Sequence, residues 1–321
     1  MRIIIYGTGA VGGTIAGLLA DAGHEVIGIS RGAQLAAIRD GGLKVRTVAG
    51  ARDTQFEVVE GPDDIDYRPD DAICLTMKGQ DCEPALAALR RAGVTEQPIF
   101  CFQNGVENER RVLRRFANVH GVTVMMPCDF IIPGEVAVFG TPCPGMFDIG
   151  LYTGGHDAAD AALVAALNDA GFAAFTADDV MASKYGKLLM NLGNIVEAAL
   201  GPDDTDDIRA ALKAEGQSAM QAAGIAWQDV GLSDPRRKDR MQIGEIPGVT
   251  RVGSSSTQSL ARATGSIETE FLNGEIELLG RLHGVPTPGN AWFTALATRI
   301  LRDGLAAGSV PVADARAALG L

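Results

Sequence analysis

The segment Gly7-Thr8-Gly9-Ala10-Val11-Gly12 decides how the N-terminal half of the chain folds. It follows the apolar run Arg2–Tyr6 and opens the stretch Ala10–Ala22, in which apolar residues recur at helical spacing. Strand, glycine-rich turn and helix in this order are typical of a dinucleotide-binding unit, where the glycines permit a tight turn, a close approach of a pyrophosphate and packing of helix on strand. We therefore predict that these six residues bind a dinucleotide; the alternative is a glycine-rich turn without a ligand.

The second predicted strand, Glu25–Ile29, is followed by Ser30 and Arg31. Proteins that bind NAD usually carry an acidic residue at this point, which bonds the ribose 2′-hydroxyl. A guanidinium instead pairs bidentately with a 2′-phosphate. The sequence therefore predicts that Arg31 selects NADP(H); a solvated loop arginine is the alternative.

Strand-like and helical patterns alternate through the first half of the chain, which predicts parallel βαβ units in a doubly wound sheet. The segment 122–152 contains short strands separated by Pro and Gly, and we expect it to form an antiparallel edge of the same sheet. A helix over 157–170 and a strand over 172–176 complete a predicted Rossmann-type NADP-binding domain at residues 1–176.

The second half, residues 177–321, shows helical patterns only and predicts an all-helical substrate domain. The class is thus α/β, with a Rossmann-type doubly wound sheet followed by an all-helical C-terminal domain. A charged connection rich in Gly and Pro runs from Gly231 to Gly253, and no strand is expected beyond Ala177. The predicted helices cover residues 182–200, 205–223, 267–283 and 291–304.

The composition excludes several classes of function. The net charge of −12 argues against nucleic acid and anionic membranes as partners. Five cysteines without paired spacing favour reduced thiols, so we expect neither a disulfide nor a metal site. No apolar run reaches the roughly 18 residues that span a bilayer. The chain runs from Met1 straight into a strand, which predicts a cytoplasmic protein.

Four polar residues follow one stripe of the predicted helix 182–200, namely Lys184, Lys187, Asn191 and Asn194. At about 100° per residue, Lys187, Asn191 and Asn194 lie within a narrow sector of the helix. Buried polar side chains in an apolar helix need partners, and such a stripe often lines a site. A solvated face of an amphipathic helix is the alternative.

Three further positions are candidates for ligand contacts. Asn104, within Gln103-Asn104-Gly105, follows a predicted strand of the first domain, where loops face the cofactor crevice. Glu268 falls in the first turn of the predicted helix 267–283, where an acid either binds a ligand or only favours the helix dipole. Ser256 lies in a serine run that is compatible with an ordinary loop.

Together these residues resemble the ketopantoate reductase family over nearly the whole chain. The departures lie in the second half. Tyr185 replaces a usual tryptophan, Ile195 occupies the more usual asparagine position, no acid stands near Leu260, and Ile267 replaces a frequent threonine. The resemblance is carried by Gly7-Thr8-Gly9-Ala10-Val11-Gly12-Gly13, Thr76-Met77-Lys78, Gln103-Asn104-Gly105, Tyr185-Gly186-Lys187-Leu188 with Asn191, Glu268, Asn273-Gly274 and Gly284-Val285-Pro286-Thr287-Pro288.

The resemblance implies an oxidoreductase with NADPH as hydride donor, which reduces 2-dehydropantoate (ketopantoate) to pantoate in pantothenate and coenzyme A synthesis. It implies Lys187 as the catalytic lysine and general acid. Asn191 and Glu268 belong to the same predicted catalytic group, in which Asn191 orients the lysine or the carbonyl. Lys78 and Asn104 are expected at the crevice of cofactor and substrate. Substrate contacts are expected from Ser256, Glu268, Asn191 and Asn194. The partner is then a small 2-oxo acid, and a homodimer remains open. The alternatives are a related reductase of another 2-oxo acid or imine, and a non-catalytic NADPH-binding sensor.

Overall fold

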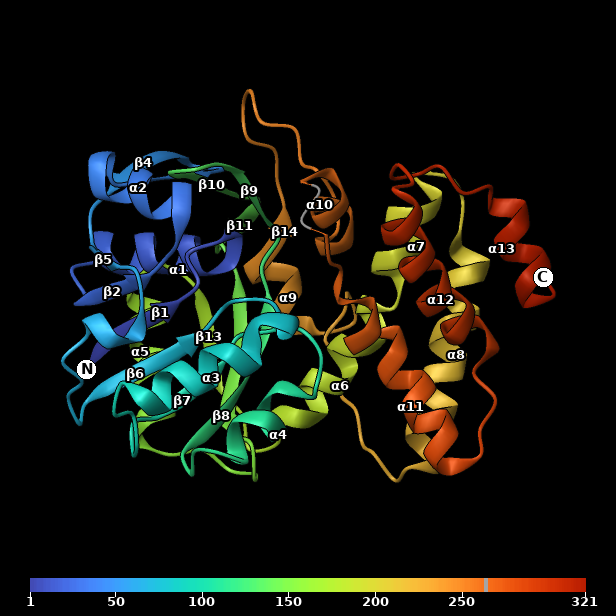
Figure 1. The fold of residues 1–321 in the computed structure, drawn as a ribbon, viewed down its shortest axis with the longest axis horizontal. Coiled ribbons are helices and arrows are strands. Elements are labelled where there is room, and N and C mark those ends of the chain that lie inside the picture. Colours follow the sequence, from blue (N-terminus) through green and yellow to red (C-terminus); the bar gives the residue numbers. More distant parts are fainter. Residues whose placement is uncertain (263–264) are drawn as a thin grey trace. The chain divides into compact units, whose positions relative to one another are not determined.

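The computed structural model describes residues 1–262 and 265–321, which form two compact units (Figure 1). The first unit comprises Met1–Lys184 and Asp229–Thr250, and the second comprises Tyr185–Gln228 and Arg251–Leu321. The sequence predicted one division after residue 176, with everything beyond it in the helical domain. The structure differs because the chain returns to the first unit for the segment 229–250.

An eight-stranded sheet forms the centre of the first unit, with strand order β13-β12-β8-β7-β6-β1-β2-β5. Neighbouring strands are parallel except β8 and β12, which pair in opposite directions. The order runs outward in both directions from β1, so the predicted doubly wound α/β class is confirmed. The bounds are β1 Arg2–Tyr6, β2 Val26–Ile29, β5 Glu57–Val59, β6 Asp71–Leu75, β7 Ile99–Cys101, β8 Val119–Met125, β12 Met146–Leu151 and β13 Ala173–Thr176.

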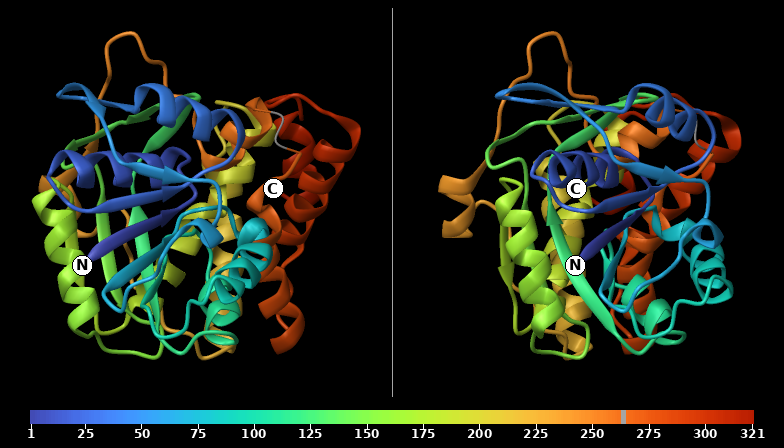
Figure 2. Two further views of the ribbon diagram at one scale, coloured as in Figure 1. Left: turned by 60° about the vertical axis from the view of Figure 1, so that its left-hand side comes forward. Right: turned by 90° about the vertical axis from the view of Figure 1, so that its left-hand side faces the viewer.

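Both faces of this sheet are covered, as parallel sheets require. Ile3 and Ile5 of β1 lie in a core with α1 and α5, whereas Ile4 and Tyr6 lie in a second core with α3 and α4. Figure 2 shows strands of the sheet between α5, in light green, and α3, in cyan. The helices and short turns of this unit are α1 Ala10–Asp21, α2 Gly32–Gly41, η1 Pro62–Asp64, η2 Gly79–Asp81, α3 Cys82–Arg91, α4 Asn108–Leu113 and α5 Ala158–Asp169.

A separate four-stranded sheet corrects the expectation for residues 122–152. β8 and β12 do form an antiparallel part of the main sheet, but β9 (Cys128–Ile132) and β10 (Glu135–Val138) do not join it. They extend the hairpin of β3 (Leu43–Thr47) and β4 (Gly50–Thr54), in the order β4-β3-β10-β9. The sequence analysis did not predict that hairpin, so it missed the partner of β10.

The segment 229–250 belongs to the first unit because it is bonded to it along its length. β14 (Met241–Ile243) pairs antiparallel with β11 (Gly140–Pro142), which corrects the expectation of no strand beyond Ala177. Within α9 (Pro235–Arg240), the Arg236 guanidinium bonds both carboxylate oxygens of Asp148 at 2.7 and 3.1 Å. The partner strand lies 100 residues earlier in the chain, and a three-residue strand has too short a pattern to reveal it.

The second unit is helical, apart from its connections. Two helices predicted as continuous are interrupted: residues 182–200 at Leu192, and residues 267–283 at Leu272. Among the described residues, no helix combines the length and apolar character needed to span a membrane. The bounds are α6 Val180–Asn191, which begins in the first unit, α7 Gly193–Leu200, α8 Asp206–Ala222, α10 Ser255–Ala261, η3 Glu268–Phe271, α11 Asn273–His283, α12 Pro288–Asp303 and α13 Val312–Leu319.

Candidate dinucleotide site and polar cluster

The glycine-rich loop between β1 and α1 has a backbone that only glycine fits at two positions. Gly7 has a φ of +106°, in the region that side chains disfavour. A methyl group at Gly12 would overlap the Gly7 carbonyl oxygen and Oγ1 of Thr76. Gly7 therefore allows the turn, and Gly12 allows the first turn of α1 to pack against β1 and β6.

Gly9 differs, because a methyl group there would meet nothing within 4 Å. Gly9 is the N-cap of α1, no side chain of the described residues caps it, and the first turn contains no acid. The N-terminus of a twelve-residue helix thus presents N–H groups and a positive dipole end beside open space. This arrangement fits the pyrophosphate of a dinucleotide.

Side chains around the loop hold it in place. Thr8 donates from Oγ1 to Oγ of Ser30 at 2.6 Å, which joins the loop to the end of β2. Gln34 donates to the Thr8 carbonyl oxygen at 2.8 Å and accepts from the Gly134 N–H at 2.8 Å. Arg31 is the exposed N-cap residue of α2. The polar residue directly after β2 is thereby bonded inward, while Arg31 faces solvent.

Lys78 and Asn104 follow β6 and β7, which lie next to β1 in the sheet. Thr76 donates to the Gly7 carbonyl oxygen at 2.7 Å, so the end of β6 adjoins the glycine-rich loop directly. Lys78 and Asn104 are both half-buried. Because the carboxyl ends of parallel strands share one edge of a sheet, the loops that carry these residues emerge at the same edge as Gly7–Gly12.

In the second unit, Lys187 is half-buried and Asn191 is buried, both on α6. Each has an interaction partner. Asn194 lies beyond the interruption at Leu192, on α7, where its backbone carbonyl accepts from Oγ of Ser254 at 3.0 Å. Leu192 keeps helical backbone angles, so Asn194 follows Asn191 at near-helical spacing although the two residues belong to different helices.

Ser256 and Glu268 are both buried, with exposed fractions of 2% and 6%. Ser256 lies within α10 rather than in a loop, and Ser254 caps that helix through the Thr257 N–H. Glu268 is the first residue of η3, and its Oε2 accepts from Oγ of Ser255 at 3.2 Å. Ser255, which sequence reasoning did not single out, therefore brings α10 and Glu268 together.

Lys184 separates from the rest of its predicted stripe. It belongs to the first unit, is 3% exposed, and forms an ion pair with the buried carboxylate of Glu109. The sequence analysis did not single out Glu109. A lysine among apolar helix residues was the available signal, but its partner lies 75 residues away in sequence and no local pattern links the two.

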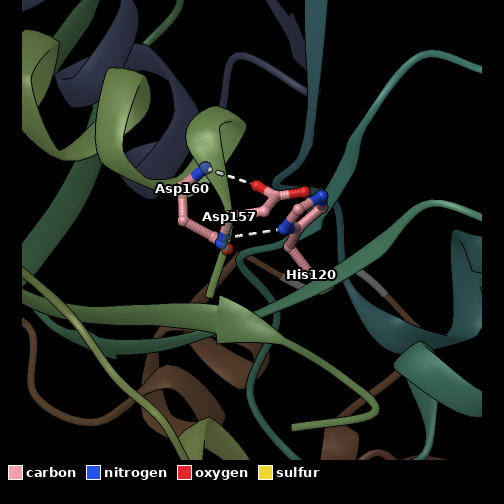
Figure 3. Close-up of side chains that lie close together, drawn as sticks. All are labelled: His120, Asp157 and Asp160. Atoms are coloured by element: carbon pink, nitrogen blue, oxygen red, sulfur yellow. Dashed lines mark hydrogen bonds and ion pairs between the residues drawn. The ribbon is translucent and has the colours of Figure 1, made fainter. Parts of the chain in front are cut away.

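Among the described residues, His120 of β8 has the spacing of a metal ligand with Asp157 and Asp160 at the start of α5 (Figure 3). His120 Nδ1 lies 2.7 Å from Oδ1 of Asp160, and Nε2 lies 2.9 Å from Oδ1 of Asn118. Asp157 and Asp160 also accept backbone N–H groups in the capping box of α5. These hydrogen bonds give the cluster a structural role in joining α5 to β8.

Comparison with known proteins agrees with the resemblance found in the sequence. The family model "Ketopantoate reductase PanE/ApbA" matches residues 3–154. The resemblance to the ketopantoate reductase family is confirmed. A 2-dehydropantoate 2-reductase of Pyrococcus horikoshii is 25% identical over 92% of this chain and 96% of its own length. One of Archaeoglobus fulgidus is 27% identical over 88% and 92%.

Solved structures extend the similarity to the fold. A PanE/ApbA family ketopantoate reductase from Ralstonia eutropha JMP134 superposes with a TM-score of 0.77, at 27% identity over 95% of this chain and 99% of its own. A D-mandelate dehydrogenase, solved with NADH and anilino(oxo)acetate, shares the fold with a TM-score of 0.76 at 21% identity, over 94% and 99% of the two chains. The α/β unit followed by a helical region is thus an arrangement found in ketopantoate reductases.

Proposed function

We propose that this protein is an NADPH-dependent reductase that converts 2-dehydropantoate to pantoate. The observation that carries the cofactor part is the open space at Gly9, beside the uncapped N-terminus of α1. The substrate part is supported by curated relatives named 2-dehydropantoate 2-reductase, which the chain matches over most of both lengths.

The preference for NADPH rests on Arg31. The strand β2 ends at Ile29, and the next two residues are Ser30 and Arg31, so no carboxylate occupies the position that would bond a ribose 2′-hydroxyl. Ser30 is bonded to Thr8, whereas Arg31 is exposed at the N-terminus of α2. An exposed guanidinium at this position suits a 2′-phosphate.

The bound cofactor supplies a hydride to the carbonyl carbon of the substrate. The carbonyl oxygen then gains a proton, and the Lys187 ammonium is the group we assign as its donor. The same positive charge stabilises the developing alkoxide before the proton moves. The half-buried position of Lys187, beside the buried amide of Asn191 on the same helix, suits a donor that is partly screened from water.

Ser256, Glu268, Asn191 and Asn194 are the residues we assign to substrate binding. Ser256 offers a hydroxyl for the substrate carboxylate, and Glu268 offers an acceptor for the substrate hydroxyl. Glu268 already accepts from Ser255, so the second hydrogen bond would use remaining lone pairs of its carboxylate. A buried acceptor of this kind discriminates against a substrate without the hydroxyl, because the hydrogen bond to that hydroxyl is then missing.

A second candidate is reduction of another 2-oxo acid. It is favoured by Leu260 and Ile267, because the resembled family tends to carry an acid and a threonine in those regions. Leu260 lies on α10, and Ile267 is the N-cap of η3 directly before Glu268. Both side chains are apolar and would suit a less polar substrate.

The test is oxidation of NADPH, followed by absorbance, with ketopantoate and with ketoisovalerate, which lacks the hydroxymethyl group. We expect kcat/KM to favour ketopantoate by about a hundredfold or more, the scale on which an unpaired buried polar group acts. Glu268→Ala should remove most of this ratio. Equal rates with both acids, or a preference for a bulky apolar one, would support the second candidate instead. No oxidation with any acid would favour an NADPH-binding sensor.

A further inference from the structure

Lys184 and Glu109 form a buried ion pair that the proposed reaction does not use. Lys184 lies near the start of α6 and is 3% exposed, and Glu109 lies in α4 and is fully buried. Lys184 Nζ is 2.5 Å from Oε1 of Glu109. Within the described parts of the chain, neither carboxylate oxygen of Glu109 has a hydrogen-bond partner, so its contact with Lys184 is an ion pair. The ammonium is thus the main source of stabilisation for this carboxylate.

The same ammonium also donates to backbone carbonyls at the end of β7, in the loop that follows it, and in the middle of β8. Nζ lies 3.0 Å from the Gln103 carbonyl oxygen, 3.3 Å from that of Val122 and 3.4 Å from that of Cys101. An ammonium has three protons, and these three carbonyls match that number, while the ion pair adds the attraction of opposite charges. One side chain therefore joins α6 to α4, β8 and the loop that follows β7.

The packing of α6 on β8 leaves this side chain little freedom. A methyl group at Gly121 would lie 2.9 Å from Cγ1 of Val180, so the sheet admits the helix only because that residue is glycine. One turn along, Oγ of Ser183 lies 2.5 Å from Oγ1 of Thr123. The start of α6 is held against β8 by close contact and by hydrogen bonds, with Lys184 at the end of this contact.

Lys184 and the backbone that it bonds lie close in sequence to two residues of the proposed reaction, Lys187 and Asn104. The carbonyl it bonds at Gln103 immediately precedes Asn104. Lys187 follows three residues later on α6, a rise of about 4.5 Å along a regular helix. The ammonium therefore fixes the backbone on the N-terminal side of both Asn104 and Lys187.

We propose that Lys184 and Glu109 are positioning residues, which fix the start of α6 and the loop after β7 so that Lys187 and Asn104 are held in productive orientations. This inference rests on the proposed reductase function. It assigns no contact with substrate or cofactor to either residue.

The energetics of buried charges support a role other than stability. Burial raises the pKa of the Glu109 carboxyl, and the nearby Lys184 ammonium opposes that rise. Replacing a buried ion pair by apolar residues of similar size is often neutral or stabilising, because desolvation of two charges offsets their attraction. A fold that needed only stability at this point would be served as well by apolar side chains.

The test replaces the whole pair by apolar residues, Lys184→Met with Glu109→Leu, so that no buried charge is left unpaired. We expect kcat for ketopantoate to fall by about thirtyfold or more, because small misplacements of reacting groups have effects of this size. The dissociation constant for NADPH should stay within about threefold, since neither residue is assigned to bind it. A kcat within about twofold of wild type would overturn the proposal.

The first unit offers a matched control in Arg2 and Asp71. Their ion pair is also buried, at 2.7 Å between Nε and Oδ1, but it lies at the amino ends of β1 and β6. Arg2→Met with Asp71→Leu removes a comparable pair at the opposite edge of the sheet. Its kcat should stay within about twofold of wild type. An equal fall in both double variants would mean that general loss of structure explains the result.

A conservative variant separates geometry from charge. Glu109→Gln keeps the length of the side chain but removes its charge, whereas Glu109→Leu removes the polar group as well, so Glu109→Gln should retain more of the wild-type kcat than Glu109→Leu. If Glu109→Gln lowers kcat as much as Glu109→Leu, the geometric role is wrong.

Amide hydrogen exchange provides a measurement that is independent of activity. In the Lys184 and Glu109 double variant, exchange should become faster in residues 102–108 and 180–191, with no such change in the Arg2 and Asp71 control. If no 2-oxo acid supports NADPH oxidation by the wild-type protein, the proposed function fails. Hydrogen exchange alone then decides whether the pair positions these segments. Unchanged exchange in both segments would overturn the proposal.

Discussion

The glycine-rich loop of the first unit and a polar network of the second are built in different ways. The loop is defined within six residues, by the positive φ of Gly7, the close packing of Gly12 and the open space at Gly9. The polar network depends on side chains far apart in sequence, which bond one another and the backbone between α6 and α7; its members are Arg209, Glu215, Asn273 and Asn290. Local patterns therefore predict the loop, whereas the network forms through tertiary contacts.

At the interruption between α6 and α7, side chains distant in sequence bond the backbone. Asn273 donates from Nδ2 to the Leu192 carbonyl oxygen at 3.2 Å and to Oδ1 of Asn290 at 3.1 Å. Asn290 in turn donates to Oε2 of Glu215 at 2.8 Å. Arg209 bonds the Gly193 carbonyl oxygen at 3.1 Å, in the space that a side chain at Gly193 would fill. Side chains of α11 and α8 thus bond the Leu192 and Gly193 carbonyls at the interruption.

The largest expected effect falls on the second unit. Lys187→Met removes the proposed proton donor and keeps the volume, so kcat should fall by about a hundredfold or more while NADPH affinity stays nearly unchanged. Steady-state kinetics and NADPH fluorescence measure the two quantities.

The control for that variant is Lys213→Met, an exposed lysine on α8 of the same unit, which should leave kcat unaltered. Lys184, one turn before Lys187, does not serve as a control because its loss would leave Glu109 buried without its partner. A larger loss of kcat from Lys213→Met than from Lys187→Met would reject the assignment of Lys187.

In the first unit, Arg31→Ala should weaken NADPH binding by about tenfold or more and change NADH binding little, because only NADPH has the 2′-phosphate. Dissociation constants for both cofactors provide the measurement. Arg39→Ala, on the same helix α2, is the matched control for loss of one positive charge. Equal weakening of both cofactors by Arg31→Ala would contradict the role assigned to this residue.

The free energy of unfolding provides a test of the polar network in the second unit. Asn273→Ala removes donors from the Leu192 carbonyl and from Asn290, and we expect the free energy of unfolding to fall by about 2 kcal/mol, as for buried groups left without a partner. Denaturant titration measures this change. If Asn273→Ala unfolds at the wild-type midpoint, the network does not stabilise the interruption at Leu192.

The same contrast explains what the sequence could predict. The first half of the main sheet and the loop at Gly7–Gly12 follow from short, regular patterns, and the structure agrees with them. Lys184 looked like part of a stripe with Lys187, yet its partner Glu109 belongs to another helix, and periodicity carries no information on such pairing. Likewise, the break at Leu192 is invisible in an apolar stretch whose stabilising donors come from Asn273 and Arg209.

The smallest expected change in stability is that of Gly9→Ala, which we compare with Gly12→Ala in the same loop. Gly9→Ala introduces a methyl group into open space, so the free energy of unfolding should fall by about 1 kcal/mol or less, the cost of a poorer N-cap residue. NADPH affinity should nevertheless fall, because that space is where we place the pyrophosphate. Gly12→Ala should instead destabilise the protein without ligand, since its methyl group would overlap the Gly7 carbonyl oxygen. Thermal unfolding without cofactor, together with NADPH titration, separates the two variants. Wild-type NADPH affinity in Gly9→Ala would show that the cofactor does not approach α1 at this point.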